Sequence, residues 1–234
     1  MSGLPRVVAD AGVLAAAAAE VVAAHAARAL AARGAFRIAV PGGRSPRGML
    51  AALAAAPPRE ALEWSRVTVL FADERALPPD DAESNYRLVR EALLDPLGNR
   101  APRVVRMAAD APDLEGAARA YEAELALPLD LLVLGIGEDG HVASLFPGSP
   151  LLAERVRRVA AVTDSPKPPA RRLTLTPRAI AEARGLLVLA AGSGKAEAVA
   201  GALAAGADPS RIPAALARAG EWLVDREAAA RLRG

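Results

Sequence analysis

A short segment near the middle of the chain carries the residues best suited to acid–base chemistry. It begins with the apolar run Leu131–Leu134, breaks at two glycines, and continues with Glu138, Asp139 and His141. An apolar run bounded by glycines is typical of a strand that is buried on both faces of a parallel sheet. Ligands of such sheets bind just beyond the carboxyl ends of the strands. We therefore expect His141 to lie where chemistry takes place.

Two glycine turns, each between a predicted strand and a helix, are candidates for binding an anion. The first contains Gly42, Gly43, Arg44 and Ser45, with Ser45 as the expected N-cap of the following helix. Backbone N–H groups at a helix start attract phosphate, although a simple connecting turn has the same composition. The second turn ends in Lys195, a cation that the helix dipole disfavours there unless an anion binds. It lacks the full glycine spacing of a P-loop.

A third candidate is the charged triplet Asp73, Glu74 and Arg75, which follows a predicted strand over 67–71. Charges crowded at the carboxyl end of a strand indicate a site. A solvated loop is an equally good interpretation of the triplet alone. The chain has no G-x-S-x-G motif, so an activated serine is not expected.

The segments that must position these residues alternate between strands and helices. We predict further strands over 36–40, 104–106, 156–162, 185–191 and 221–225, and a half-buried one over 171–176. We predict helices over 10–33, 84–94, 113–125, 196–203, 213–219 and 226–232, and one more capped by Thr176. This alternation favours a single domain over residues 1–234, with three α/β/α layers and a mostly parallel, Rossmann-like sheet. All candidate features then fall on one edge of that sheet.

Composition excludes several other kinds of protein. The 234 residues contain no cysteine, which excludes disulfides, thiol catalysis and cysteine-bound metals. The net charge is +2 with both signs interspersed, which suits a small anionic ligand and not nucleic acid. No apolar stretch is judged long enough to span a membrane, and we expect a cytoplasmic protein. His25 is interpreted as an ordinary helix residue, which leaves one usable histidine without a cluster of other ligands, so we expect no metal. We also expect no cofactor.

Five segments, in chain order, resemble the 6-phosphogluconolactonase family. They are PGGRSP, FADERALPPDDAESNY, LGIGEDGHVASLFPGSP, RLTLTP and GSGKAEAV, and they span Pro41 to Val199. The family shares its fold with glucosamine-6-phosphate isomerases and deaminases, which carry a glutamate in a segment of the type FNEP. This chain has Ser144-Leu145-Phe146-Pro147 there, without a carboxylate, which favours the lactonase. It also has Asp81 where lactonases often have a histidine.

The resemblance implies hydrolysis of 6-phospho-D-glucono-1,5-lactone to 6-phospho-D-gluconate in the oxidative pentose phosphate pathway. In this interpretation His141 activates water as a general base, and Asp139 or Glu138 orients the imidazole. Arg75 binds the substrate's oxygens or the developing oxyanion. Asp73 is expected to be a catalytic residue as well. The 6-phosphate is bound by the first glycine turn, Arg172 and Lys195.

Other functions stay open at this point. One is a sugar-phosphate isomerase or deaminase on the same fold, and another is a non-catalytic sugar-phosphate-binding protein. A nucleotide-binding Rossmann domain would require G-x-G-x-x-G, which PGGRSP does not supply. We expect a monomer or weak homo-oligomer, and a loop over Asp164–Pro169 that is able to move.

Overall fold

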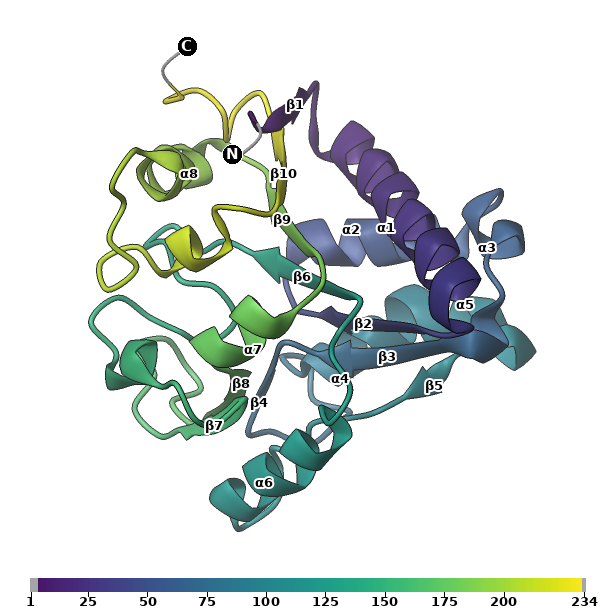
Figure 1. Ribbon diagram of the computed structural model, residues 1–234, viewed down its shortest axis with the longest axis horizontal. Helices are drawn as coiled ribbons and strands as arrows, with labels where there is room; N and C mark the ends of the chain where they lie inside the picture. Colours follow the sequence, from purple (N-terminus) through teal and green to yellow (C-terminus); the bar gives the residue numbers. More distant parts are fainter. Residues whose placement is uncertain (1–3, 233–234) are drawn as a thin grey trace.

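The computed structural model describes residues 4–232, and its centre is a sheet of seven parallel strands (Figure 1). The strands lie in the order β1-β10-β9-β6-β2-β3-β5. Their bounds are β1 Arg6–Val8, β2 Phe36–Val40, β3 Val67–Phe71, β5 Arg103–Val104, β6 Leu131–Gly135, β9 Leu186–Ala190 and β10 Glu221–Asp225. The predicted parallel sheet is confirmed, and β1 is an edge strand that the sequence analysis missed.

Helices cover both faces of this sheet, which confirms the predicted layers. Figure 1 shows α1 and α2 on one side of β6 and β9, and α7 and α8 on the other. The α-helices are α1 Ala11–Arg33, α2 Arg44–Ala54, α3 Pro58–Ala61, α4 Asn85–Val89, α5 Asp95–Leu97, α6 Leu114–Glu124, α7 Pro177–Glu182 and α8 Ala196–Leu203. Short 3-10 helices are η1 Trp64–Arg66, η3 Gly98–Arg100, η4 Pro150–Ala153, η5 Ser193–Lys195 and η6 Pro213–Ala217, and η2 Arg90–Leu94 is a π-helical turn.

The strand order reverses between β2 and β6. From β2 the chain builds β3 and β5 on one side, and β6 then begins the other half of the sheet. The two strands pair directly, with Ile38 opposite Leu131. Loops that leave neighbouring strands at such a reversal diverge and leave a crevice between them. The first glycine turn and the His141 loop therefore form the two sides of one crevice.

The longest helix, α1, is fixed at both ends by its own sequence. Asp10 accepts hydrogen bonds from the amides of Gly12 and Val13, both 2.9 Å long. Gly34 ends the helix in the left-handed conformation, with φ 71°. By length and composition alone α1 is apolar enough to cross a membrane, contrary to the expectation from the sequence. Its alanine-rich inner face packs against α2 and the sheet, which accounts for the apolar character within this fold.

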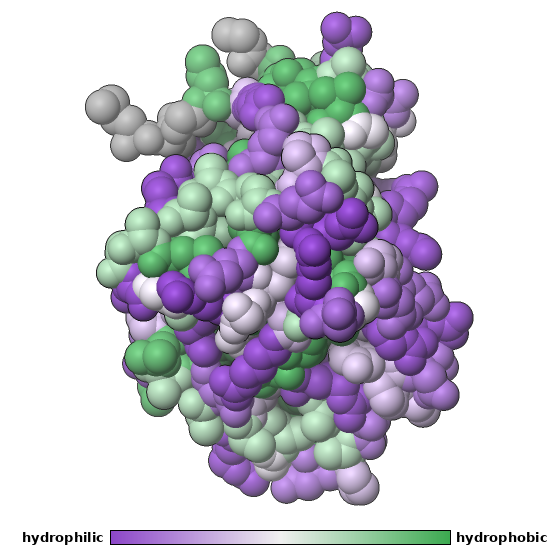
Figure 2. Space-filling model, turned by 90° about the vertical axis from the view of Figure 1, so that its right-hand side faces the viewer, coloured by the Kyte–Doolittle hydropathy of each residue, from purple (hydrophilic) through white to green (hydrophobic). Residues whose placement is uncertain are grey.

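Charged and apolar residues are mixed over the face of the molecule that Figure 2 shows. Figure 2 shows the side that lies at the right of Figure 1, where hydrophilic residues are interspersed with apolar ones. Many surface arginines pair with carboxylates, including Arg87–Glu91, Arg103–Glu124, Arg106–Asp110 and Arg158–Glu182. Exposed pairs of this kind contribute about 0–1 kcal/mol each, so burial of apolar side chains carries most of the stability.

A second, antiparallel sheet joins segments that are far apart in the sequence. It consists of β4 (Asp73–Arg75), β8 (Arg172–Leu175) and β7 (Val159–Val162), in that order. The predicted half-burial of the 171–176 segment is wrong, because all four residues of β8 are buried. β8 is the central strand of this small sheet and also contacts α6 and α7.

Three local expectations differ from the structure. The N-cap of α2 is Gly43, and Ser45 lies inside the helix. Thr176 is the N-cap residue of α7 as predicted, but its hydroxyl donates to the carbonyl of Arg157 and makes no capping hydrogen bond. Residues 226–232 form turns instead of a helix, although the Asp225 side chain accepts a hydrogen bond from the Ala228 amide at 2.8 Å, as a helix N-cap does.

One buried hydroxyl links α6 to the central sheet. The Oη atom of Tyr121 accepts a hydrogen bond from the Phe71 amide at 2.7 Å and donates to the Phe71 carbonyl at 3.2 Å. Burial raises the pKa of Tyr121, so the hydroxyl keeps its proton. This contact fixes the end of β3, from which the chain continues to Asp73.

Replacing Tyr121 with Phe should leave the Phe71 amide and carbonyl unpaired inside the protein. We expect a loss of about 1–3 kcal/mol in the free energy of unfolding. Urea denaturation followed by circular dichroism measures this loss. Tyr86→Phe is the matched control, because the described contacts give the Tyr86 hydroxyl no hydrogen bond. An equal loss in both variants would contradict the assignment.

Candidate active site

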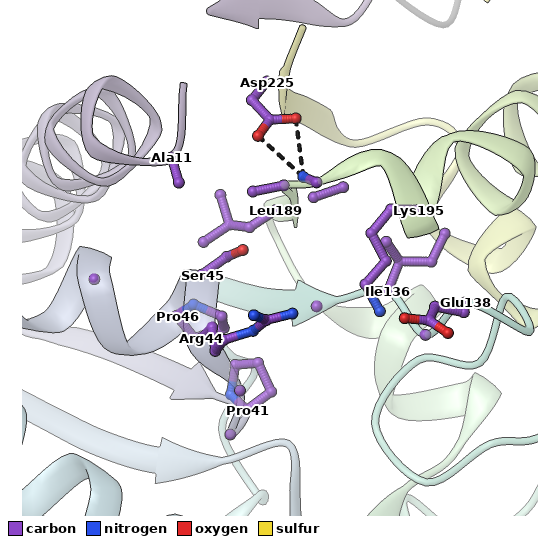
Figure 3. Close-up of a pocket in the computed structure, with 18 of the residues that line it drawn as sticks. Ala11, Pro41, Arg44, Ser45, Pro46, Ile136, Glu138, Leu189, Lys195 and Asp225 are labelled. Carbon is purple, nitrogen blue, oxygen red and sulfur yellow. Dashed lines mark hydrogen bonds between the residues drawn. The ribbon is translucent and has the colours of Figure 1, made fainter. Parts of the chain in front are cut away.

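The predicted features meet at one pocket at the carboxyl edge of the main sheet. The pocket has a volume of about 960 Å³. Figure 3 shows Arg44 and Ser45 on one side of it, with Lys195 and Glu138 across from them. Of the residues singled out from the sequence, its walls include Gly42, Gly43, Arg44, Ser45, Asp73, Arg75, Glu138, His141, Arg172 and Lys195.

His141 and Asp139 form a hydrogen-bonded pair in the loop after β6. The Nδ1 atom of His141 lies 2.5 Å from Oδ1 of Asp139. When the ionised carboxylate accepts the Nδ1–H, the Nε2 atom of the neutral imidazole is left free to accept a proton. The His141 side chain is 20% exposed and lines the pocket, so water can reach it. This is the arrangement of a general base with an orienting carboxylate.

A glycine makes room for this pair. A Cβ atom on Gly137 would lie 2.0 Å from His141 Nδ1 and 2.3 Å from Asp139 Oδ1. The Gly137 amide also donates to the carbonyl of His141 at 2.9 Å, which closes the loop. From the sequence, Gly137 is predicted only to end a strand, because its close approach to the imidazole arises from the folded loop.

Asp139 is held ionised by its two partners. Burial alone would raise the pKa of this carboxyl group, but contacts with His141 and Lys167 lower it well below its usual range. The Nζ atom of Lys167 lies 3.2 Å from Asp139 Oδ2. Asp139 and Glu138 were alternatives at the sequence level, and among the described contacts only Asp139 contacts the imidazole.

Glu138 faces the start of α8 instead. Its carboxylate lies against Gly194, where an added Cβ would be 3.0 Å from Oε1. Burial lowers the pKa of Lys195, and the negative charge of Glu138 opposes that effect. The structure thus places Glu138 beside Lys195 and separates it from the His141 ring.

The segment after His141 contributes a ring and a hydroxyl to the site. The rings of Phe146 and His141 have centroids 4.6 Å apart. The Ser144 hydroxyl donates to Asp73 Oδ2 at 2.7 Å. From the sequence, this segment is distinguished only by its lack of a carboxylate, and neither contact is predicted.

Asp73 is 4% exposed and is held from two sides. Besides Ser144, the side chain of Asn85 donates to its Oδ1 at 3.1 Å and to its backbone carbonyl at 2.9 Å. Asn85 also packs against the first glycine turn, since a Cβ on Gly42 would lie 1.9 Å from its Oδ1 atom. Asn85 thereby ties β4 to the turn after β2. Asn85 is the middle residue of the SNY segment that carries the family resemblance, but its role here is not predicted from the sequence.

The rest of the charged triplet organises the loop before α4. The buried carboxylate of Glu74 accepts hydrogen bonds of 2.7–2.8 Å from the amides of residues 75, 85 and 86. Burial raises the pKa of Glu74, and these bonds partly offset the effect. Arg75 lines the pocket while its guanidinium donates to the Glu83 carbonyl. Asp81 accepts from the Glu83 amide at 2.8 Å and is not among the residues of the pocket wall.

The first glycine turn leaves backbone donors open toward the pocket. Gly43 has φ 104°, a conformation that other residues rarely adopt. Arg44 and Ser45 begin α2, so their amides have no acceptor inside the helix. Arg44 extends into the pocket (Figure 3). Open amides at a helix start, together with a guanidinium, suit a phosphate group.

The second glycine turn differs, because carboxylates of the same chain occupy its amides. The Gly192 amide donates to both Asp225 oxygens at 3.1 and 3.0 Å, as Figure 3 shows, and the Ser193 amide donates to Glu227 at 3.2 Å. Two amides of this turn are therefore already paired within the protein, and phosphate binding by its backbone stays a prediction. Its contribution to the pocket is the side chain of Lys195.

Arg172 reaches the pocket wall, but most of its donors are already used. Its Nε donates to the carbonyl of Pro169, and its Nη2 donates to those of Lys167 and Pro168, all at 2.8–2.9 Å. Its Nη1 lies 3.4 Å from the Ser144 hydroxyl. The main role visible for Arg172 is to hold the loop over 164–169, while phosphate binding stays a prediction.

The lowered pKa of Asp139 predicts a pH-dependent contribution to stability. Its ionised form stabilises the fold above the unfolded value of about 3.8, and this contribution is lost as the pH falls below that value. Relative to Asp139→Asn, the wild-type protein should lose about 1 kcal/mol between pH 5 and acidic pH, discounted for partial exposure. Chemical denaturation across pH measures the difference. Asp164→Asn is the control, and an equal response in both variants would contradict the prediction.

Comparison with known proteins agrees with the geometry. Residues 9–224 match the family model described as Glucosamine-6-phosphate isomerases/6-phosphogluconolactonase. A 6-phosphogluconolactonase of Streptomyces coelicolor is 44% identical across 99% of this chain and 96% of its own length. The human 6-phosphogluconolactonase is 42% identical across 80% of this chain and 74% of its own length.

Solved structures lead to the same family. The 6-phosphogluconolactonase of Trypanosoma brucei superposes with a TM-score of 0.83 at 28% identity, covering 98% of this chain and 99% of that one. A monomeric glucosamine-6-phosphate deaminase superposes with a TM-score of 0.80 at 24% identity, which shows a common fold. This chain therefore belongs to the glucosamine-6-phosphate isomerase/6-phosphogluconolactonase family.

Proposed function

We propose that this protein hydrolyses 6-phospho-D-glucono-1,5-lactone to 6-phospho-D-gluconate. The observation that carries the proposal is the pairing, within one pocket, of the Asp139–His141 dyad with a glycine turn whose amides are open. The first group can activate water, and the second can bind the phosphate of the same small molecule. The names of the relatives at 42–44% identity support the same activity.

His141 acts as the general base in the proposed reaction. Nε2 accepts a proton from a water molecule whose oxygen attacks C1 of the lactone, and Asp139 stabilises the imidazolium that forms. The tetrahedral intermediate collapses by breaking the bond from C1 to the ring oxygen, which receives the proton back from His141. A lactone is an activated ester, so no covalent nucleophile is required. Base catalysis of this kind contributes about 10²–10⁴-fold.

Two other groups bind the reacting molecule in this proposal. Arg75 stabilises the negative charge that develops on the carbonyl oxygen, with loop N–H groups as alternative donors. Asp73, fixed by Ser144 and Asn85, lies in the same wall of the pocket and orients a substrate hydroxyl.

The phosphate binds Arg44, the amides of the first glycine turn and Lys195. The location in the cytoplasm and a monomeric or weakly associating state remain predictions.

This site lacks the acidic side chain that isomerase or deaminase activity would require. Where those enzymes have a glutamate, this chain places Phe146 against the His141 ring. We therefore expect no ammonia release from glucosamine 6-phosphate, which an enzyme-coupled ammonia assay measures directly.

Replacing His141 with Asn should remove most of the turnover above the spontaneous rate, by about 10²–10⁴-fold. The measurement is proton release from freshly made 6-phosphoglucono-δ-lactone, corrected for uncatalysed opening. His25→Asn is the matched control, since it removes the chain's other histidine at a site outside the pocket. Turnover near the wild-type level in His141→Asn would refute the assignment of the base.

Replacing Lys195 with Ala should mainly raise KM, by about 10–100-fold, because a charge-assisted hydrogen bond to phosphate is worth about 1.5–3 kcal/mol. The phosphate does not react, so ground state and transition state lose the contact equally and kcat should change little. Steady-state kinetics in the same assay separates the two constants. A fall in kcat with unchanged KM would argue against a phosphate contact.

A further inference from the structure

One carboxylate of the site connects the catalytic imidazole to a lysine on another loop. Asp139 uses Oδ1 to contact Nδ1 of His141 at 2.5 Å and Oδ2 to contact Nζ of Lys167 at 3.2 Å. Lys167 lies in the wall of the pocket, 26 residues further along the chain than His141. From the sequence, its loop is predicted only to be able to move.

The loop holds Lys167 firmly by its backbone. The Lys167 carbonyl accepts hydrogen bonds from Arg172 Nη2 and from the Ser165 hydroxyl, both at 2.8 Å. Arg172 is itself 4% exposed and holds the next two carbonyls of the loop as well. A buried guanidinium that donates most of its hydrogen bonds to one loop fixes the position of that loop. The Lys167 ammonium therefore reaches Asp139 from a backbone whose position is fixed by these hydrogen bonds.

The composition of the chain singles out this lysine. Lys167 and Lys195 are the only lysines among the 29 basic residues, and both line the pocket. Everywhere else the chain uses arginine. Both lysines of the chain therefore add a positive charge to the pocket.

We propose that Lys167 is a positioning residue that sets, through Asp139, how strongly His141 holds a proton. The proposal deepens the proposed function, because it concerns the same base. An unshared carboxylate stabilises the imidazolium more than one whose charge is partly neutralised. By pairing with Asp139, Lys167 weakens the hold of His141 on its proton and keeps the imidazole neutral, and thus active as a base, to lower pH.

Several other charged side chains lie near the Asp139–His141 dyad, and their charges are unaltered in a variant that changes only Lys167. Glu138 is on the same loop as the dyad, Lys195 is at the start of α8, Arg172 is in β8 beside the Phe146 ring, and Asp73, Arg75 and Arg44 are on the remaining walls. Variants at position 167 therefore isolate the contribution of this one cation. Lys167→Met removes the charge, and Lys167→Arg keeps it.

The direct test is an NMR titration of the two histidines in the free protein. His25 serves as an internal reference, because it contacts Glu221 and lies outside the pocket. In Lys167→Met, the titration midpoint of His141 should rise by about 0.5 pH unit, while that of His25 should not move. Lys167→Arg should restore the wild-type midpoint. An unchanged His141 midpoint in Lys167→Met would overturn the proposal.

Kinetics provides the second readout. The acidic limb of the profile of kcat/KM against pH should shift upward in Lys167→Met by the same amount and return in Lys167→Arg. A rise in KM at every pH without such a shift would show that Lys167 only binds substrate, and would overturn the positioning role. The NMR titration needs no turnover. An inactive wild-type protein with a shifted midpoint would therefore refute the proposed function and leave the coupling from Lys167 to His141 intact.

Discussion

The direct pairing of β2 with β6 is the constraint on which the site depends. These strands lie where the order of the parallel sheet reverses, so the loops that follow them leave toward opposite sides of one crevice. One loop offers open amides at a helix start, and the other presents an imidazole with its carboxylate. A phosphate and a reactive carbonyl of one small molecule can then be held at the same time, which is the main requirement for catalysis by orientation.

Hydrogen-bond satisfaction decides which parts of the crevice remain available to a ligand. The two glycine turns look alike in sequence, yet Asp225 and Glu227 occupy the amides of the second one. Arg172 is similarly committed to the carbonyls of the loop that carries Lys167. Groups that are satisfied within the protein make a rigid frame. Groups that have no partner among residues 4–232, such as the amides after Gly43 and the Nε2 of His141, are left for the substrate.

Much of the fold could be predicted because its signals are local. The cap at Asp10, the stop at Gly34 and the apolar run of β6 each act over a few residues. The features that sequence reasoning missed depend on contacts across long separations. The burial of β8 results from its place in the small sheet, and the roles of Ser144 and Asn85 exist only once β4 has brought Asp73 to them. The choice of Asp139 over Glu138 depends on the path of one loop, which residue types alone do not specify.

The most direct test of this account is a crystal structure of the protein with 6-phosphogluconate. The account predicts that the phosphate contacts the amides after Gly43 and the Lys195 ammonium, and that the C1 carboxylate lies within hydrogen-bond distance of His141 Nε2. The opposite orientation, with the phosphate at His141 and C1 at the glycine turn, would contradict the central claim that the dyad acts on the lactone carbonyl.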